Sequence, residues 1–318
     1  TRPNSLAHRT TWLRSDLAGA EMVALMGHTN PDGDAIGSVY GLALALQAAG
    51  KETDVFLEPY GEVFSLIPTG GLCRQTARNQ YDVAVALDCG DEERLGAYIE
   101  VFRRGKTTVN IDHHGSNVGF GDYRYVDGDA SSASELVYNL LDGFLPFNCE
   151  IATALYAGIL FDTGGFRHSS TSPDTLRKAA HLMSFGVPFT KLYNEIFFSR
   201  SLAEARALGK AAVEASLTEG ILFAFLSLDD LASVGATPQD TAEISGFLKG
   251  VRQCRAAVLC YEKTPGQWKA SMRSDEGTNV AEVAMHFGGG GHKQAAGCTL
   301  VGSREEIEQK IRSAFLAQ

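Results

Sequence analysis

One histidine and two aspartates share a single short stretch of the sequence, HTNPDGDAIGS, which runs from His28 to Ser38. The stretch follows an apolar run and precedes a segment with the pattern of a helix. Carboxylates this close repel one another unless hydrogen-bond donors or cations neutralise them. The stretch is therefore either a helix N-cap with a spare acid or part of a metal site.

Three further groups of acids and histidines follow predicted elements of the first half: Asp88, Asp112 with His113 and His114, and Asp162. A single aspartate at the end of an element is commonly a cap or a loop acid. Four such groups in one domain are much harder to explain as independent caps. Ligands of doubly wound sheets bind beyond the carboxyl ends of the strands, so we expect these groups to form a metal site.

The ligand types favour two ions over one. Five aspartates with two or three histidines exceed the protein ligands that one octahedral ion usually takes, and mixed carboxylate and imidazole ligands suit Mn²⁺. Cys89 directly follows Asp88, so in a strand its side chain points to the opposite face and adds no thiolate. A pair of metal ions clamps the attacking and leaving oxygens of an in-line phosphoryl displacement.

The elements that must position these residues alternate between strand and helix. An alternation of this kind predicts a parallel, doubly wound α/β sheet. We predict strands within 22–28, 54–57, 82–91 and 107–117 and helices within 35–50, 131–143 and 149–166. Ser132 and Glu135 are spaced as a capping box for the second of these helices.

A helical pattern from about residue 172 to Arg206 separates this region from a second, smaller α/β region. Strands are predicted there within 220–228, 255–263 and 267–274, and the last two are close enough in sequence to form a hairpin within a mixed sheet. We expect a first domain at 1–185, a helical connector at 186–206 and a second domain at 207–318.

The second region contains a run of four glycines followed by a histidine and a lysine, in FGGGGHKQAAG. Glycines let backbone approach a ligand and expose N–H groups to an anion, whereas a glycine run without context would be a flexible linker. We expect a phosphate-binding loop made by Gly289, Gly290, Gly291 and His292. Arg167, close in sequence to Asp162, is a further candidate for a phosphate contact.

The composition narrows the classes of partner. The net charge is −10 and no strong basic stripe is present, which argues against long nucleic acid as the main ligand. No apolar run is long enough to span a bilayer, so we expect no membrane partner. The six cysteines lack metal-like spacing, which is typical of a reduced, cytoplasmic protein.

These motifs together resemble the DHH phosphoesterase family. The residues that carry the resemblance are HTNPDGDAIGS, Asp88, the Asp112–His113–His114 triplet, Asp162 and the segment Gly288–Gly297. The resemblance covers nearly the whole chain, and no motif position departs from the family pattern. The size and layout are most similar to the branch of nanoRNases that also dephosphorylate 3′-phosphoadenosine 5′-phosphate.

The resemblance implies that the domain at 1–185 is catalytic and that the domain at 207–318 binds substrate, with the active site in the cleft between them. It also implies a role for each residue of the motifs. His28 and Asp32 would hold one Mn²⁺, Asp34, His113 and Asp162 would hold the other, and Asp88 would bridge them. Asp112 would orient a ligand, and His114 would face the scissile phosphate. Arg273 would pair with a terminal phosphate, for which its fork is suited. Mg²⁺ or Co²⁺ could substitute for Mn²⁺.

The implied activity is hydrolysis of short 5′-phosphorylated RNA or DNA oligonucleotides to 5′-mononucleotides, and of 3′-phosphoadenosine 5′-phosphate to AMP, by hydroxide that two metals activate. A phosphodiesterase for cyclic dinucleotides or their linear products pGpG and pApA is the nearest alternative. A non-catalytic nucleotide sensor is an alternative from another class. A homodimer is compatible with these features, and the sequence leaves open the direction of degradation.

Overall fold

The computed structural model describes residues 6–316. The chain forms two compact units, Thr1–Ser199 and Arg200–Gln318. None of the described helices combines the length and the apolar character that crossing a membrane requires.

The first unit is built on a five-stranded sheet in which every pair of neighbouring strands is parallel. The strands lie in the order β2 (Glu52–Phe56), β1 (Met22–Met26), β3 (Tyr81–Leu87), β4 (Gly105–Asp112) and β5 (Tyr123–Val126). The order reverses between β1 and β3, and such a switch point is where doubly wound sheets bind ligands. The predicted parallel sheet is therefore confirmed, although the sequence did not predict β5.

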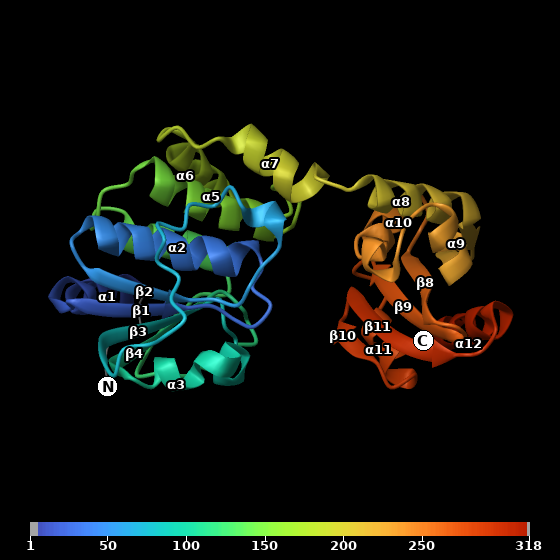
Figure 1. The fold of residues 1–318 in the computed structure, drawn as a ribbon, viewed down its shortest axis with the longest axis horizontal. Coiled ribbons are helices and arrows are strands. Elements are labelled where there is room, and N and C mark those ends of the chain that lie inside the picture. The colour runs from blue at the N-terminus through green and yellow to red at the C-terminus, as the bar shows by residue number, and fades with distance from the viewer. Residues whose placement is uncertain (1–5, 317–318) are drawn as a thin grey trace. The chain divides into compact units, whose positions relative to one another are not determined.

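Helices cover both faces of this sheet, as a doubly wound fold requires. In Figure 1, α2 and α5 lie on one side of the strands and α3 on the other. The sheet side chains alternate accordingly: Val23 and Leu25 pack in the larger core, whereas Ala24 and Met26 pack against the opposite layer. The helices of the unit are α1 (Leu6–Gly19), α2 (Gly33–Ala48), η1 (Glu62–Phe64), η2 (Glu92–Tyr98), α3 (Ile99–Phe102), α4 (Ala133–Leu141), α5 (Cys149–Asp162), α6 (Pro173–Met183) and α7 (Phe189–Phe198).

Glycines allow α2 and α5 to approach closely. A Cβ at Gly37 would lie 2.5 Å from the carbonyl oxygen of Ala154 and 2.8 Å from the nitrogen of Gly158. A Cβ at Gly158 would lie 2.8 Å from Oδ1 of Asp34 and would collide with Oγ of Ser134. The absence of side chains at these two positions lets the first turn of α2 lie against the last turns of α5.

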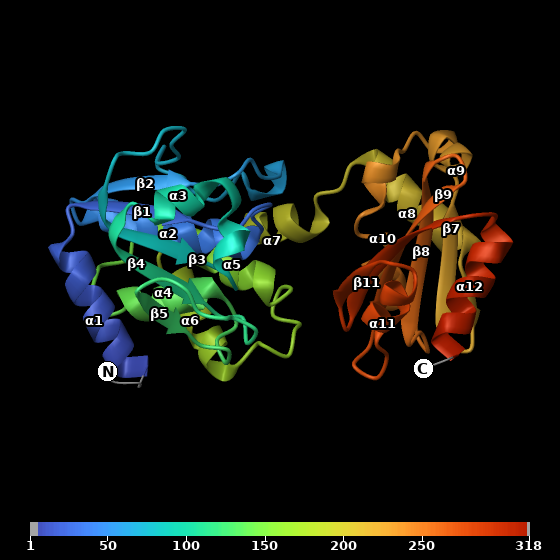
Figure 2. The same ribbon diagram turned by 90° about the horizontal axis from the view of Figure 1, so that it is seen from below.

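The second unit is built on a six-stranded mixed sheet in the order β10 (Gly290–His292), β11 (Ala295–Val301), β9 (Gln267–Ser274), β8 (Ala256–Thr264), β7 (Ile221–Leu226) and β6 (Ser216–Thr218). Only the β7–β8 pair is parallel. The predicted hairpin is present as β8 and β9, which confirms the expected mixed sheet. The helices are α8 (Leu202–Glu214), α9 (Leu228–Ser233), η3 (Pro238–Thr241), α10 (Ile244–Lys249), α11 (Val280–His286) and α12 (Arg304–Leu316). Figure 2 shows α12 and α8 on opposite sides of β7 and β8.

Two local expectations differ from the structure. Ser132 caps α4 by accepting a hydrogen bond from the backbone N–H of Glu135, but the Glu135 carboxylate does not return to Ser132, so the predicted capping box is only half formed. Instead the carboxylate accepts hydrogen bonds from Ser131, Thr175 and Lys178. The helical segment before the second unit is divided, because α7 belongs to the first unit and α8 to the second.

Candidate metal centre and phosphate-binding surface

The loop after β1 gives Asp32 two simultaneous functions. Its Oδ1 accepts hydrogen bonds from the backbone N–H groups of Asp34 and Ala35, at 3.0 and 3.1 Å, and so caps α2. Its Oδ2 lies 3.8 Å from Nε2 of His28. An N-cap and a metal ligand are therefore compatible at Asp32, because they would use different oxygens of one carboxylate.

His28 is fixed in the tautomer that a metal ligand needs. Its Nδ1 lies 2.8 Å from the carbonyl oxygen of Thr29, which accepts the ring N–H, so in the neutral imidazole the lone pair lies on Nε2. Burial would lower the pKa of His28, but the carboxylates of Asp32 and Asp88 outweigh it and raise the pKa to about 10. The surroundings of Nε2 thus favour positive charge at that point.

Asp88 occupies the first position after β3 and has a left-handed backbone, with a φ of 57°. Its backbone N–H donates to the carbonyl oxygen of Ile111, which ties the turn to β4. Its Oδ2 lies 3.7 Å from Nε2 of His28, and its Oδ1 lies 3.6 Å from Nε2 of His113. Asp88 is therefore the residue that lies between the two histidines.

Asp34 is fully buried in the first turn of α2 and is held by the N-terminus of α4. The backbone N–H of Ala133 donates to Oδ2 at 2.6 Å, and that of Ser134 donates to Oδ1 at 2.9 Å. Burial, together with the charges of Asp88 and Asp162, nevertheless raises the pKa of Asp34. Two N–H groups orient this carboxylate without neutralising the acids around it.

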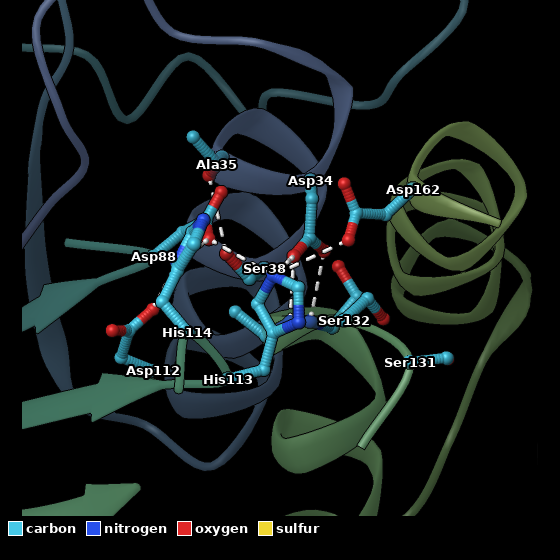
Figure 3. Close-up of polar contacts among 12 residues, drawn as sticks. Asp34, Ala35, Ser38, Asp88, Asp112, His113, His114, Ser131, Ser132 and Asp162 are labelled. Carbon is cyan, nitrogen blue, oxygen red and sulfur yellow. Dashed lines mark hydrogen bonds and ion pairs between the residues drawn. The ribbon is translucent and has the colours of Figure 1, made fainter. Parts of the chain in front are cut away.

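His113, the first residue after β4, brings the remaining acids together (Figure 3). Its Nε2 lies 3.2 Å from Oδ2 of Asp162, the last residue of α5, and 4.0 Å from Oδ2 of Asp34. The pKa of Asp162 is raised to about 6, because burial, together with the charge of Asp88, outweighs the opposing charge of His113.

The donor set fits divalent cations. Ligand atoms of His28, Asp32 and Asp88 lie within 4.8 Å of one another, and so do those of Asp34, His113 and Asp162. Among the described residues, Oδ1 of Asp88 is buried without a hydrogen-bond partner. A buried, unpaired carboxylate oxygen is costly unless a cation neutralises it. Carboxylate and imidazole are also the ligands that Mn²⁺ and related ions take.

His114 lies beside these groups, with its Nδ1 3.6 Å from Oδ1 of Asp88, and it is held by a hydrogen-bonded chain. Its Nδ1 lies 2.7 Å from Oδ1 of Asp112, which is fully buried. The other oxygen, Oδ2, accepts a hydrogen bond from Nδ2 of Asn117 at 2.6 Å. The His114 side chain is 39% exposed, so its ring is oriented from one side and open to solvent on the other.

The second unit places His292 and Arg273 in one row across three strands. In the antiparallel register Ala295 pairs with His292 on one side and with Arg273 on the other. Directly opposed residues of antiparallel strands lie on the same face, so the two basic side chains flank the small side chain of Ala295. His292 is exposed, and the Arg273 guanidinium hydrogen-bonds the carbonyl oxygen of Met272.

The glycine run is ordered by β11. A Cβ at Gly291 would collide with the carbonyl oxygen of Ala295, and one at Gly289 would collide with that of Gly297. The backbone N–H of Gly289 donates to the carbonyl oxygen of Ala284. Close strand packing therefore explains two of the glycines, whereas a Cβ at Gly290 would meet open space.

Arg167 lies in the exposed turn that follows α5, and its backbone N–H donates to the carbonyl oxygen of Thr163. Its side chain is exposed on the turn that begins at Asp162. The structure thus brings together every predicted metal ligand, and it places Arg167 on the adjoining turn.

Two groups that hold the acids of this site were not predicted from the sequence. Asn117 was included in a predicted strand with no role, although an amide five residues after Asp112 offers donors to that carboxylate. The N-terminus of α4 was predicted as a helix start but not as the group that holds Asp34. The contact joins residues about a hundred positions apart in the chain, and no local pattern encodes it.

Comparisons with known proteins agree with this geometry. Residues 22–159 match the model of the DHH family N-terminal domain, and residues 219–317 match the DHHA1 domain. The chain is 33% identical over 289 residues to the bifunctional oligoribonuclease and PAP phosphatase NrnA of Thermus thermophilus, covering 86% of this chain and 83% of that protein. The protein of the same name from Bacillus subtilis is 29% identical, covering 88% and 90%.

The fold is shared with solved structures. An exopolyphosphatase-related protein from Bacteroides fragilis matches with a TM-score of 0.86 and 22% identity, covering 100% of this chain and 98% of that one. The two domain matches and the 33% identical relative confirm the family expected from the motifs, and the chain belongs to the DHH family.

Proposed function

We propose that this protein hydrolyses short 5′-phosphorylated oligonucleotides to 5′-mononucleotides and converts 3′-phosphoadenosine 5′-phosphate to AMP. The observation that carries the proposal is the pair of ligand groups in the first unit, one made by His28, Asp32 and Asp88 and the other by Asp34, His113 and Asp162. Relatives named oligoribonuclease and PAP phosphatase cover most of the chain at 29 to 33% identity, which supports the same activity here.

We propose Mn²⁺ as the metal, with Mg²⁺ or Co²⁺ as substitutes. His28, Asp32 and Asp88 would hold one ion, and Asp34, His113 and Asp162 would hold the other together with Asp88. When bound, two such cations would supply charge for the attacking and leaving oxygens and favour the hydroxide form of water near neutral pH. The α4 N–H groups keep Asp34 in place for this task.

The other side chains bind and orient the substrate. His114, held through Nδ1 by Asp112, would direct Nε2 to the scissile phosphate and hold or donate a proton there. Arg273 and His292, which flank Ala295, would bind the 5′-phosphate one nucleotide away, and Gly290 and Gly291 would allow its close approach. Arg167 would contact a phosphate near Asp162.

Separate residues for the scissile phosphate and for the 5′-phosphate would explain how one site accepts two substrates. A 5′-phosphorylated dinucleotide and 3′-phosphoadenosine 5′-phosphate both carry a 5′-phosphate and a phosphorylated 3′-oxygen. The second resembles the first without its terminal nucleoside. In both reactions the bond between the 3′-oxygen and phosphorus breaks, and the 3′-oxygen leaves with a proton. The products are two mononucleotides in one case, and AMP with inorganic phosphate in the other.

A substrate panel tests the proposal. With Mn²⁺ present we expect turnover of pApA, pGpG, a short RNA and 3′-phosphoadenosine 5′-phosphate and weaker turnover of 5′-hydroxyl ApA. We expect little turnover of a cyclic dinucleotide, a long RNA or pyrophosphate. Turnover restricted to a cyclic dinucleotide would favour that alternative activity. Binding of pApA without any turnover would instead indicate a nucleotide sensor.

A further inference from the structure

Asn117 has no role in the proposed function, although it is hydrogen-bonded to Asp112, which in turn holds His114. Nδ2 of Asn117 reaches three acceptors: Oδ2 of Asp112 at 2.6 Å, Oδ1 of Asn110 at 2.9 Å and the carbonyl oxygen of Cys89 at 3.1 Å. An amide nitrogen has only two hydrogens, and the shortest of the three contacts is to the only charged acceptor. The amide group is thus directed at Asp112.

The other side of the Asn117 amide is also fixed. Its Oδ1 accepts a hydrogen bond from the backbone N–H of Gly119 at 2.6 Å. The backbone N–H of Asn117 donates to the carbonyl oxygen of His114. The side chain therefore cannot flip its oxygen toward Asp112 without placing two acceptors together and losing the Gly119 contact.

Asp112 cannot orient His114 alone. Its carboxylate is fully buried at the end of β4, and each oxygen has a different partner: Oδ1 has His114 and Oδ2 has Asn117. Without the Asn117 donor, Oδ2 would be an unpaired buried charge. The carboxylate would then rotate toward another donor, and the imidazole that depends on Oδ1 would lose its fixed direction.

We infer that Asn117 is a positioning residue for the hydrolytic reaction, acting through Asp112 to aim the imidazole of His114. The inference rests on the proposed function, because it assumes that His114 faces the phosphate. Removing a residue that orients an active-site side chain through a hydrogen bond typically lowers activity by about 10- to 100-fold. The effect should fall on kcat and should depend on the presence of His114.

A double-mutant cycle tests the inference. The variants are Asn117→Ala, His114→Ala and the double substitution, assayed with Mn²⁺ and pApA. We expect Asn117→Ala to lower kcat by about 10- to 100-fold, with KM within about twofold and the bound Mn²⁺ unchanged. In the His114→Ala background the same substitution should change kcat by less than about twofold, since no imidazole remains to be aimed.

Two further variants separate positioning from folding. Asn117→Asp keeps an acceptor for Gly119 but places a second carboxylate against Asp112, so its kcat should fall at least as far as that of Asn117→Ala. Asn148→Ala removes another asparagine that bonds backbone, the N-cap of α5. It should lower the melting temperature without lowering kcat, because it lies at the opposite end of α5 from Asp162.

The outcomes separate this inference from the proposed function. Three results would overturn the positioning role while leaving the proposed activity intact. The first is that Asn117→Ala lowers kcat by the same factor in the wild-type chain and in His114→Ala. The others are a loss of bound Mn²⁺ in Asn117→Ala and a wild-type kcat in Asn117→Asp. Absence of turnover by the wild-type chain on every substrate of the panel would overturn the proposed function, and this inference with it.

Discussion

Nε2 of His113 lies 3.2 Å from Oδ2 of Asp162, although one residue directly follows β4 and the other ends α5. The contact depends on how closely α5 lies against α2, because Asp34 must reach the same point from the first turn of α2. Glycines at the helix contact make this approach possible. The packing of two helices therefore determines whether the ligands meet.

Substitution of Gly158 tests that dependence. Alanine in a helix interior is normally more favourable than glycine by about 1 kcal/mol. At Gly158, however, the new methyl group would press on Ser134 and on Oδ1 of Asp34, so we expect Gly158→Ala to lower the stability by about 1–3 kcal/mol and to lower activity.

Gly209 in α8 is a matched control, since a Cβ there would meet nothing within 4 Å. Gly209→Ala should raise the stability slightly and leave activity unchanged. Chemical denaturation and pApA hydrolysis measure both quantities. Equal stabilisation by the two substitutions would show that the helix contact tolerates a side chain.

Asp88 is expected to be indispensable because its two oxygens approach a histidine of each ligand group, Nε2 of His28 at 3.7 Å and Nε2 of His113 at 3.6 Å. Asp88→Asn keeps the size of the side chain, and asparagine tolerates the left-handed backbone found there. Alanine would add about 1–2 kcal/mol of backbone strain. We expect Asp88→Asn to lower kcat at least about a hundredfold, which corresponds to about 3 kcal/mol of transition-state stabilisation. A wild-type rate in Asp88→Asn would refute its shared role.

His292 should matter for binding the 5′-phosphate rather than for bond cleavage. Loss of a hydrogen bond to a charged group costs about 1.5–3 kcal/mol, so His292→Ala should raise KM for pApA about tenfold or more, with kcat nearly unchanged. The KM for 5′-hydroxyl ApA should not change. His286→Ala, at the exposed end of α11 in the same unit, is the control. An equal effect on both substrates would remove His292 from the phosphate site.

Glu135 provides a pH-dependent contribution to stability. Burial would raise the pKa of its carboxyl, but hydrogen bonds from Lys178 and Ser131 outweigh it and lower the pKa below 4.5. A group with a lowered folded pKa stabilises the fold above its unfolded pKa and loses that contribution as the pH falls through the folded pKa. Glu135→Gln should therefore cost about 1.5–3 kcal/mol at pH 7 and progressively less below about pH 4.5. Urea denaturation at several pH values measures the difference, and a difference independent of pH would contradict this assignment.

Much of the first unit was predictable because its elements carry strong local patterns. The apolar strands β1 and β3, the glycine after α2 and the acids at the strand ends are all local features. Parallel strands then bring their carboxyl ends to one edge of the sheet, so the meeting of His28, Asp88 and His113 follows from topology.

The remaining features depend on contacts between distant segments. Strand β5 is only four residues long, and its place at the sheet edge is set by pairing with β4. The side chain of Glu135 matched a capping box, but Lys178 on α6 offers it a charged donor at 2.7 Å. In the second unit the glycine run suggested only a loop, whereas strand pairing with β11 makes part of it a strand.

The number of metal ions bound per active chain tests the central claim most directly. The protein is stripped with a chelator and titrated with Mn²⁺ while bound metal and pApA hydrolysis are measured on the same samples. We predict two Mn²⁺ per chain, with activity appearing only as both positions fill and with fewer ions retained by Asp88→Asn. Full activity with no metal, or with one ion per chain, would contradict the two-metal account.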